Sequence, residues 1–454
     1  LNQNDRFVWR EGGPEAYRSL MGTYLGPPLW KARLARFEGD VAERAEEYEI
    51  WFDGSGNAFR TVHTLPEARP GTTLSEDEAR VLADSTIRGQ FGLDPDELTF
   101  IASKPSKLTA RQDWLFTFSN PAAYPLSVGE TRVEVRIAGS EVVDAHRFVF
   151  VPEEWERRER NKRSILDILQ FGCAGVLAML VLAGTIGAIV SWSRRKFALR
   201  AFLAAFALLL VVSSIQYVNN WPVYMARLMT ALPFQHQVLI LIVGGIFGTL
   251  LVSATIAIVV GMLQNWNQFR VRGKVGNGLL LGIALGGIAL GIEAVSSLFT
   301  SQSLPLWPDF GSASSFSSVL SAAISPISGF MRSTVLVLLG VGFVTRFSTK
   351  MKNGKAFRWA SFVALGVILA GGSGIESIPE WLIAGIVSGI LLAIVYNYVL
   401  VYCWEAVPVA IATLTVFSLI QQAWFRAFPG AVVGIGIGIV ILGTIAVFWE
   451  RRLR

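Results

Sequence analysis

The fold class is decided by residues 165–192, ILDILQFGCAGVLAMLVLAGTIGAIVSW, where Asp167 is the only charged residue. An apolar run of ~18 residues or more can cross a bilayer core of ~30 Å as a helix, whereas an open strand would leave its backbone groups unpaired in lipid. Similar runs follow at residues 199–217, 236–263, 276–299, 318–345, 358–375, 381–402, 406–423 and 430–448. We therefore predict an α-helical polytopic membrane bundle of about nine transmembrane helices.

The chain before residue 161 has a different composition. Of the 454 residues, 52% are hydrophobic, but residues 1–160 are rich in charge and alternate between apolar and polar as a globular domain does. We predict an extracytoplasmic α+β domain at 1–160 and a transmembrane helical domain at 161–454. The net charge of +6 comes mostly from basic clusters beside the apolar runs, which favours the lipid bilayer over nucleic acid as a partner.

The loops between the apolar runs alternate in charge. Basic residues are concentrated in alternate loops, and the loops between these carry only Arg227 and Arg426 as basic residues. The basic loops contain Arg194, Arg195, Lys196, Arg200, Arg270, Arg272, Lys274, Arg346, Lys350, Lys352, Lys355 and Arg358, and the tail contains Arg451, Arg452 and Arg454. Because basic loops stay in the cytoplasm and long domains translocate regardless of charge, we expect a cytoplasmic C-terminus and an outer domain at 1–160. That domain needs an upstream signal or anchor helix, and the chain starts at Leu1 without a methionine, so we expect a preceding segment.

The outer domain shows helix and hairpin signals in two similar halves. We predict helices at 14–25 and 72–91, the second with a capping box formed by Ser75 and Glu78 and a stop at Gly92. Predicted strands lie at 48–52, 58–64, 98–103, 114–119, 132–137 and 142–151. The order predicts two tandem helix-plus-sheet units.

The histidines and cysteines supply little chemistry. His63 and His146 lie on predicted hairpin strands, where they form either a metal pair or two ordinary surface histidines. Cys173 and Cys403 lie in apolar runs and on opposite sides of the membrane, so we expect no disulfide. The domain has no Gly-x-Ser-x-Gly and no cysteine from which a nucleophilic triad would be built.

Four short motifs resemble a known family. They are the stretches 65–71 (LPEARPG), 74–80 (LSEDEAR), 111–114 (RQDW) and 151–155 (VPEEW). Together they resemble the N-terminal region of some bacterial members of the CPBP family, the CAAX-protease-like intramembrane metalloproteases. The resemblance implies a bacterial inner (plasma) membrane protein. It also implies a metal-dependent peptidase site built from Glu-Glu-x-x-x-Arg on one membrane helix and histidines, as in Phe-x-x-x-His, on later helices.

The residues that such a site requires are missing. The chain has three histidines, and none follows His236. A literal Glu153-Glu154-x-x-x-Arg158 lies before the first span, while the positional counterpart in the fifth span has Ile327 and Ser328 in place of the glutamates, followed by Arg332. In residues 362–366, Gly366 stands where the histidine belongs. We therefore predict no catalytic residues, no metal site and no cofactor.

Two charged residues lie deep in the predicted spans. Glu293 is about six residues, or ~9 Å, from the outer end of the fourth span, and Arg332 lies at a comparable depth in the fifth. Adjacent antiparallel helices would bring them together as an intramembrane ion pair, which is either a functional site or a structural lock between two helices.

The leading hypothesis is a catalytically inactive CPBP-protease-like protein that acts as a scaffold or accessory subunit of a membrane assembly, with other membrane protein subunits as partners. One alternative is an active intramembrane endopeptidase with a divergent acidic site made of Glu293, Glu376 and Glu380. Another is a transporter of small molecules or lipids, although a carboxylate relay would need several deep acids and Glu293 stands alone among the predicted spans.

Overall fold

The computed structural model describes residues 2–39, 43, 45–264, 278–297, 305, 307–349, 351, 353–372, 374–375, 377–400 and 403–453, apart from the side chains of 278, 292–297 and 453. The predicted basic residues Arg270, Arg272, Lys274, Lys350, Lys352 and Arg454 therefore lie outside the described residues. The chain divides into two compact units. The first comprises Leu1–Arg160, Ala226–Leu241 and Leu304–Trp307, and the second comprises Asn161–Met225, Ile242–Ser303 and Pro308–Arg454.

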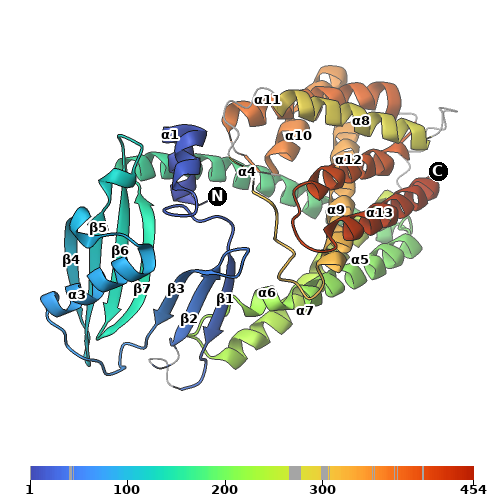
Figure 1. Ribbon diagram of the computed structural model, residues 1–454. Coiled ribbons are helices and arrows are strands. Elements are labelled where there is room, and N and C mark those ends of the chain that lie inside the picture. Colours follow the sequence, from blue (N-terminus) through green and yellow to red (C-terminus); the bar gives the residue numbers. More distant parts are fainter. Residues whose placement is uncertain are drawn as a thin grey trace. The chain divides into compact units, whose positions relative to one another are not determined.

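The first unit is built on one antiparallel sheet of seven strands in the order β1-β2-β3-β7-β6-β5-β4 (Figure 1). The strands are β1 (Trp30–Ala35), β2 (Glu47–Phe52), β3 (Ala58–Thr64), β4 (Thr99–Lys107), β5 (Gln112–Ser119), β6 (Glu130–Ala138) and β7 (Glu141–Phe150). Two helices accompany them, α1 (Gln3–Leu20) and α3 (Glu76–Thr86). Each half of the unit thus runs from a helix into a meander of strands, and the two meanders join where β3 meets β7.

Each helix of this unit covers its own part of the sheet. Helix α3 packs on β5, β6 and β7 (Figure 1). Its fully buried Ala79 and Ala83, with Ile87 just after the helix, belong to one core cluster with Phe116 and Val133 of the sheet. Helix α1 packs its apolar side against the end of β7. The predicted capping box of Ser75 and Glu78 is present.

Most strands of the sheet lie where the sequence predicts them, but the N-terminal end differs from the prediction. Strand β1 was not predicted, and the first helix begins at Gln3 rather than near residue 14, with a break in helical geometry at Gly13. The second predicted helix ends as expected: a π-helical turn at Ile87–Phe91 leads into Gly92, whose φ of 64° suits a residue without a Cβ.

The second unit is helical, and eight helices are long and apolar enough to cross a membrane by length and composition. The helices are α4 (Glu153–Ser193), α5 (Leu199–Asn219), α6 (Trp221–Met225), α7 (Phe234–Leu263), α8 (Gly278–Ser297), α9 (Ser318–Ser348), α10 (Gly354–Gly372), α11 (Ile378–Val395), α12 (Ala406–Ala423) and α13 (Ala431–Leu453). The predicted number of nine is not reached within the described residues, where α8 contributes a shorter apolar stretch, Leu279–Gly291.

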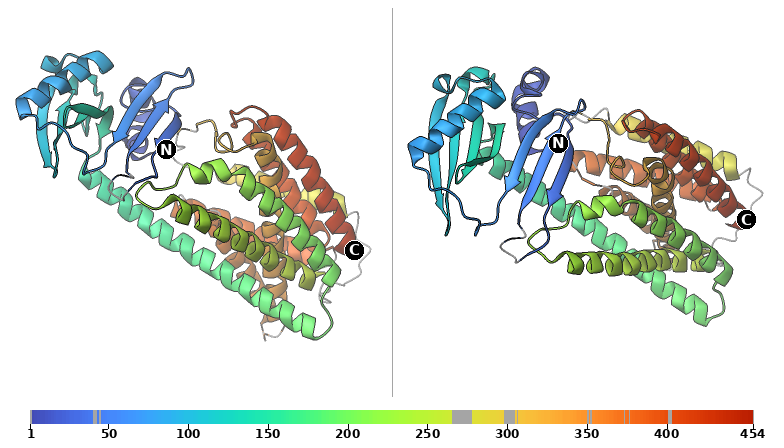
Figure 2. Two further views of the ribbon diagram at one scale, coloured as in Figure 1. Left: turned by 90° about the horizontal axis from the view of Figure 1, so that it is seen from below. Right: turned by 60° about the horizontal axis from the view of Figure 1, so that its bottom comes forward.

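Helix α9 occupies the centre of the helical unit, and over half of the residues in its most apolar stretch are buried. It packs against α5, α10, α12 and α13, and Figure 2 shows the last two helices side by side. Small residues allow several of these close contacts. Gly282 and Gly286 of α8 lie on Val409 and Thr413 of α12, and Gly434 of α13 lies on α9.

Candidate functional sites

The residues that the resemblance aligns with the CPBP glutamate motif lie in the middle of α9. Ile327 is 2% exposed and belongs to the apolar core of the unit, and the Ser328 hydroxyl donates to the Ser325 carbonyl of its own helix at 3.2 Å. Arg332 is exposed rather than turned into the core. These three positions therefore contribute packing and a local hydrogen bond, and neither Ile327 nor Ser328 can act as an acid or base.

The position expected to carry the family's histidine lies at a contact between two backbones. A Cβ on Gly366 of α10 would lie 2.5 Å from the Gly385 carbonyl oxygen of α11. In the same way, a Cβ on Gly389 would lie 2.5 Å from Val363 Cα, and one on Gly385 would lie 2.6 Å from Val367 Cα. We call Gly366, Gly385 and Gly389 the α10–α11 contact. Because even a methyl group collides there, an imidazole at position 366 would require the helices to separate.

The expected Glu293–Arg332 pair falls partly outside the described residues, since the side chain of Glu293 is not described. The helices that carry the two residues have different neighbours: α8 packs mainly on α12 and α11, whereas α9 packs mainly on α13 and α5. Of the other acids proposed for a divergent site, Glu376 lies outside the described residues. Glu380 lies in the first turn of α11, where its backbone N–H donates to the hydroxyl oxygen of Ser377, the N-cap residue.

All three histidines belong to the first unit. His63 was expected at the surface and is instead 5% exposed, with its ring stacked 3.8 Å from that of Tyr48 and Nδ1 2.5 Å from Glu141 Oε1. His146 lies on β7 beside Asp144, and His236 is exposed near the start of α7. Within the described ranges, no three His, Cys, Asp or Glu side chains are grouped to hold a metal ion.

The literal Glu-Glu-x-x-x-Arg match lies in the first turns of α4. Glu153 pairs with Arg157 one helical turn later at 3.7 Å, and both side chains are more than half exposed. This is a surface pair along one helix, which contributes little to stability. The charged run before the first span is therefore the N-terminal part of the membrane helix itself.

Side-chain charges hold the two halves of the sheet together. Strands β3 and β7 share one ladder pair, Val62 with Asp144, and Arg60 donates to both oxygens of Asp144 at 2.8 and 2.6 Å. Burial alone would raise the pKa of Asp144, but interactions with His146 and Arg60 outweigh it and lower that pKa from 3.8 to about 2. We call Arg60 and His63 of β3, with Glu141 and Asp144 of β7, the β3–β7 junction.

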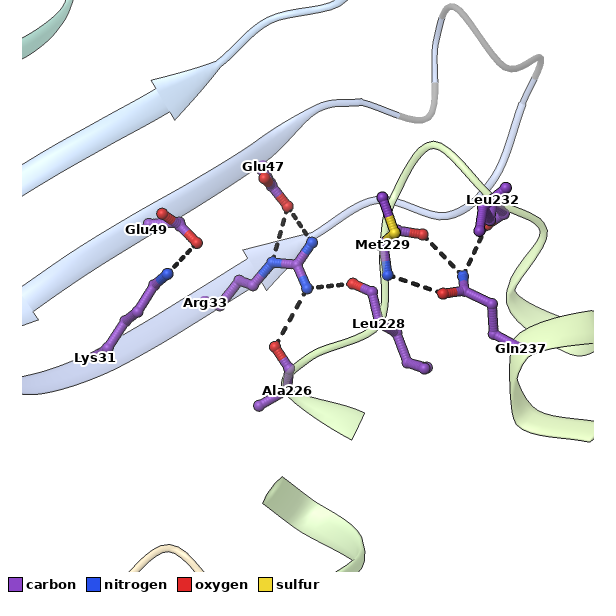
Figure 3. A network of polar contacts seen from close by, with 9 residues as sticks. All are labelled: Lys31, Arg33, Glu47, Glu49, Ala226, Leu228, Met229, Leu232 and Gln237. Carbon is purple, nitrogen blue, oxygen red and sulfur yellow. Dashed lines mark hydrogen bonds and ion pairs between the residues drawn. The ribbon is translucent and has the colours of Figure 1, made fainter. Parts of the chain in front are cut away.

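The loop before α7 is bound to strand β1 within the first unit (Figure 3). Arg33 donates to the backbone carbonyls of Ala226 (3.3 Å) and Leu228, and its Nε donates to Glu47 at 2.8 Å. Gln237 closes the loop on itself, because its side chain exchanges hydrogen bonds of 2.9 and 2.8 Å with the backbone of Met229. Sequence reasoning missed this attachment, since nothing local links Arg33 to a loop some 190 residues away.

One face of β1 and β2 is apolar and partly exposed. Trp30 and Leu34 lie on the same face of β1, and Leu34 is directly opposite Tyr48 of β2. Their exposed fractions are 45%, 65% and 40%. We call these three residues the β1–β2 face. An exposed group of large apolar side chains of this kind is typical of interaction surfaces.

The second unit contains a cavity of 620 Å³ between α5, α7, α9 and α13. It also contains a buried acid that the sequence did not reveal: Glu450 of α13 is 3% exposed. In the sequence, Glu450 is followed directly by Arg451 and Arg452, so it has the appearance of an exposed residue in a charged C-terminal tail. Both cysteines are free, and Cys403 is fully buried beside Glu405.

No known protein-family model, curated protein or solved structure matches this chain.

Proposed function

We propose that the chain is a non-catalytic membrane protein, resembling the CPBP proteases, that acts by binding as a scaffold or accessory subunit of a membrane assembly. The observation that carries the proposal is the α10–α11 contact. The family's chemistry needs an imidazole at the position of Gly366, and the neighbouring backbone at Gly385 leaves no room for one. Ile327 and Ser328 support the same conclusion, because neither side chain can replace a carboxylate as a general base.

The proposed topology has nine spans, with α8 as the fourth, in a bacterial inner membrane. The C-terminus is cytoplasmic and the first unit is outside, a placement supported by the alternation of basic loops. Both native cysteines are buried, so a single introduced thiol reports its own side of the membrane. A membrane-impermeant maleimide added to intact cells should label Asp96→Cys, whose native side chain is 88% exposed, and should leave exposed Lys355→Cys unlabelled. The reverse pattern would refute this orientation.

The sheet edge at β1 is the surface of the first unit best suited to a protein partner. The opposite edge strand, β4, carries Pro105 and two lysines, Lys104 and Lys107, which oppose the addition of another strand. Strand β1 has no proline, and its two cations are engaged by glutamates of β2. With the β1–β2 face beside it, this edge offers both backbone pairing and apolar contact to a protein subunit.

The test is purification of the full chain from its native membrane in mild detergent, with identification of the bound chains. We expect one or more membrane subunits to co-purify with the wild-type chain in a fixed ratio. They should no longer co-purify with the Leu34→Glu variant. Val81→Glu is the matched control, because Val81 of α3 is 67% exposed and Leu34 is 65% exposed. Recovery of the wild-type chain without any subunit, or equal loss from both variants, would contradict the proposal.

A further inference from the structure

The cavity in the helical unit is open to one end of the bundle. Its wall includes the first turns of α5, the C-terminal ends of α7 and α13, and Met331 of α9. Along α5 it extends from Leu199 to Leu208, which is ~13 Å at the helical rise and close to the depth of one bilayer leaflet. Its volume of 620 Å³ is in the range of ligand sites.

The deep part of the cavity is apolar, and the residues that line it are packed into the core of the helical unit. Ala205, Val260, Met331 and Trp449 line it, and each is at most 8% exposed. These residues belong to the core of the unit, so the wall is preformed by packing rather than assembled on binding. A wall of this composition favours hydrocarbon over water.

The mouth of the cavity is cationic. Arg200 lies in the first turn of α5 and Arg452 in the last turn of α13, and both line the cavity. The Arg452 guanidinium lies 5.1 Å over the ring of Phe448, and Gln264 donates to the Arg452 carbonyl at 3.5 Å. Among the described residues that line the cavity, none is acidic, so the lining itself offers these arginines no carboxylate.

We propose that this cavity binds an anionic membrane lipid, with one acyl chain between α5, α7, α9 and α13 and the phosphate headgroup at Arg200 and Arg452. Basic pockets between membrane helices recognise lipid headgroups through charge, and the buried methylenes of the chain add apolar contact. The arrangement distinguishes lipid from free phosphate, because a free anion gains nothing from the apolar wall. It also distinguishes headgroups, because a zwitterionic lipid brings its own cation to the two arginines.

The experiment uses the full chain in a nonionic detergent and measures binding by native mass spectrometry and thermal shift. The probes are phosphatidylglycerol and phosphatidylcholine with identical acyl chains, and inorganic phosphate alone. We expect phosphatidylglycerol to bind at least tenfold more tightly than phosphatidylcholine, and inorganic phosphate to give no shift. Equal affinity for the two lipids would overturn the headgroup assignment. A shift with phosphate as large as that with lipid would overturn the acyl-chain assignment.

Two pairs of variants test the site itself. Arg200→Gln with Arg452→Gln should weaken phosphatidylglycerol binding about thirtyfold, since each basic side chain near an anionic headgroup contributes roughly fivefold. The matched control, Arg194→Gln with Arg451→Gln, removes two neighbouring charges that do not line the cavity.

Ala204→Phe fills the exposed part of the cavity and should abolish selective binding. Leu203→Phe lies on the same helix but does not line the cavity, so it should leave selective binding unchanged. Equal effects in variants and controls would overturn the proposal, and the headgroup comparison on the wild type decides it independently if a variant does not fold.

Discussion

The α10–α11 contact and the β3–β7 junction join their elements by opposite means. At the first, glycines bring two backbones into direct contact, and beside them Trp381 Nε1 of α11 donates to the Val367 carbonyl of α10 at 2.9 Å. At the second, a single ladder pair is supplemented by Arg60 with Asp144 and by His63 with Glu141. A contact made by shape excludes acid–base chemistry and is insensitive to pH, whereas a junction made by charges titrates. The helical position where the resemblance places a histidine is thus of the kind that cannot host one.

The largest effect should come from Gly366→Ala. The added methyl group would lie 2.5 Å from the Gly385 carbonyl, so the helices must shift, at a cost of about 3 kcal/mol in the free energy of unfolding. Hydrogen exchange of α10 and α11 amides in detergent measures it. The control is Gly244→Ala on α7, where a Cβ meets nothing within 4 Å and no loss is expected. Normal stability of Gly366→Ala would show that the contact has room for a side chain.

The junction should respond to the loss of one charge. Asp144→Asn should lower the free energy of unfolding of the first unit by about 2 kcal/mol at pH 7, because Arg60 loses its partner in a mostly buried setting. Urea unfolding, followed by a dye on Asp96→Cys, provides the measurement. Asp77→Asn, at an exposed position in α3, should change it by less than ~0.5 kcal/mol.

The same variant should reveal the pH dependence of the junction. The pKa of Asp144 is about 2 in the folded protein and 3.8 as the reference for the unfolded chain. A carboxyl with a lowered pKa stabilises the fold fully above its unfolded pKa and loses that effect as the pH falls through its folded pKa. The difference between wild type and Asp144→Asn should therefore be constant above about pH 4 and shrink toward pH 2. A constant difference down to pH 2 would assign the stabilisation to something other than this charge.

The smallest effect concerns the one place where a charge pair is expected inside the helical bundle. Glu293→Gln and Arg332→Gln, singly and together, form a double-mutant cycle. If the two side chains pair, the losses are non-additive by about 1 kcal/mol in unfolding measurements. Additive losses would refute the pairing.

Hydrophobic length made the membrane helices predictable from sequence, since ~20 apolar residues have one stable arrangement in a bilayer. The predicted boundary was inaccurate at residues 153–163, because this stretch is mostly charged and its helix is fixed by a distant contact, that of buried Trp155 with Phe7 of α1. Strand β1 escaped prediction because it is short, and the residues that pair with it and make it a strand are on β2.

The sites were less predictable than the elements. The close approach of Gly366 to Gly385 depends on which helices pack together, and sequence order does not specify this. The burial of Glu450 and the bond between Arg33 and the loop at Ala226 are long-range features of the same kind. The absence of histidines after His236, in contrast, is a property of the sequence alone.

The central claim, that the chain binds but does not cleave, is tested most directly by a peptidase assay. The purified chain is reconstituted in liposomes, supplied with divalent metal ions, and given a prenylated peptide and a membrane-embedded peptide. We predict product no greater than in protein-free liposomes, for the wild type and for Glu293→Gln alike. Cleavage by the wild type that is lost in Glu293→Gln would contradict the account.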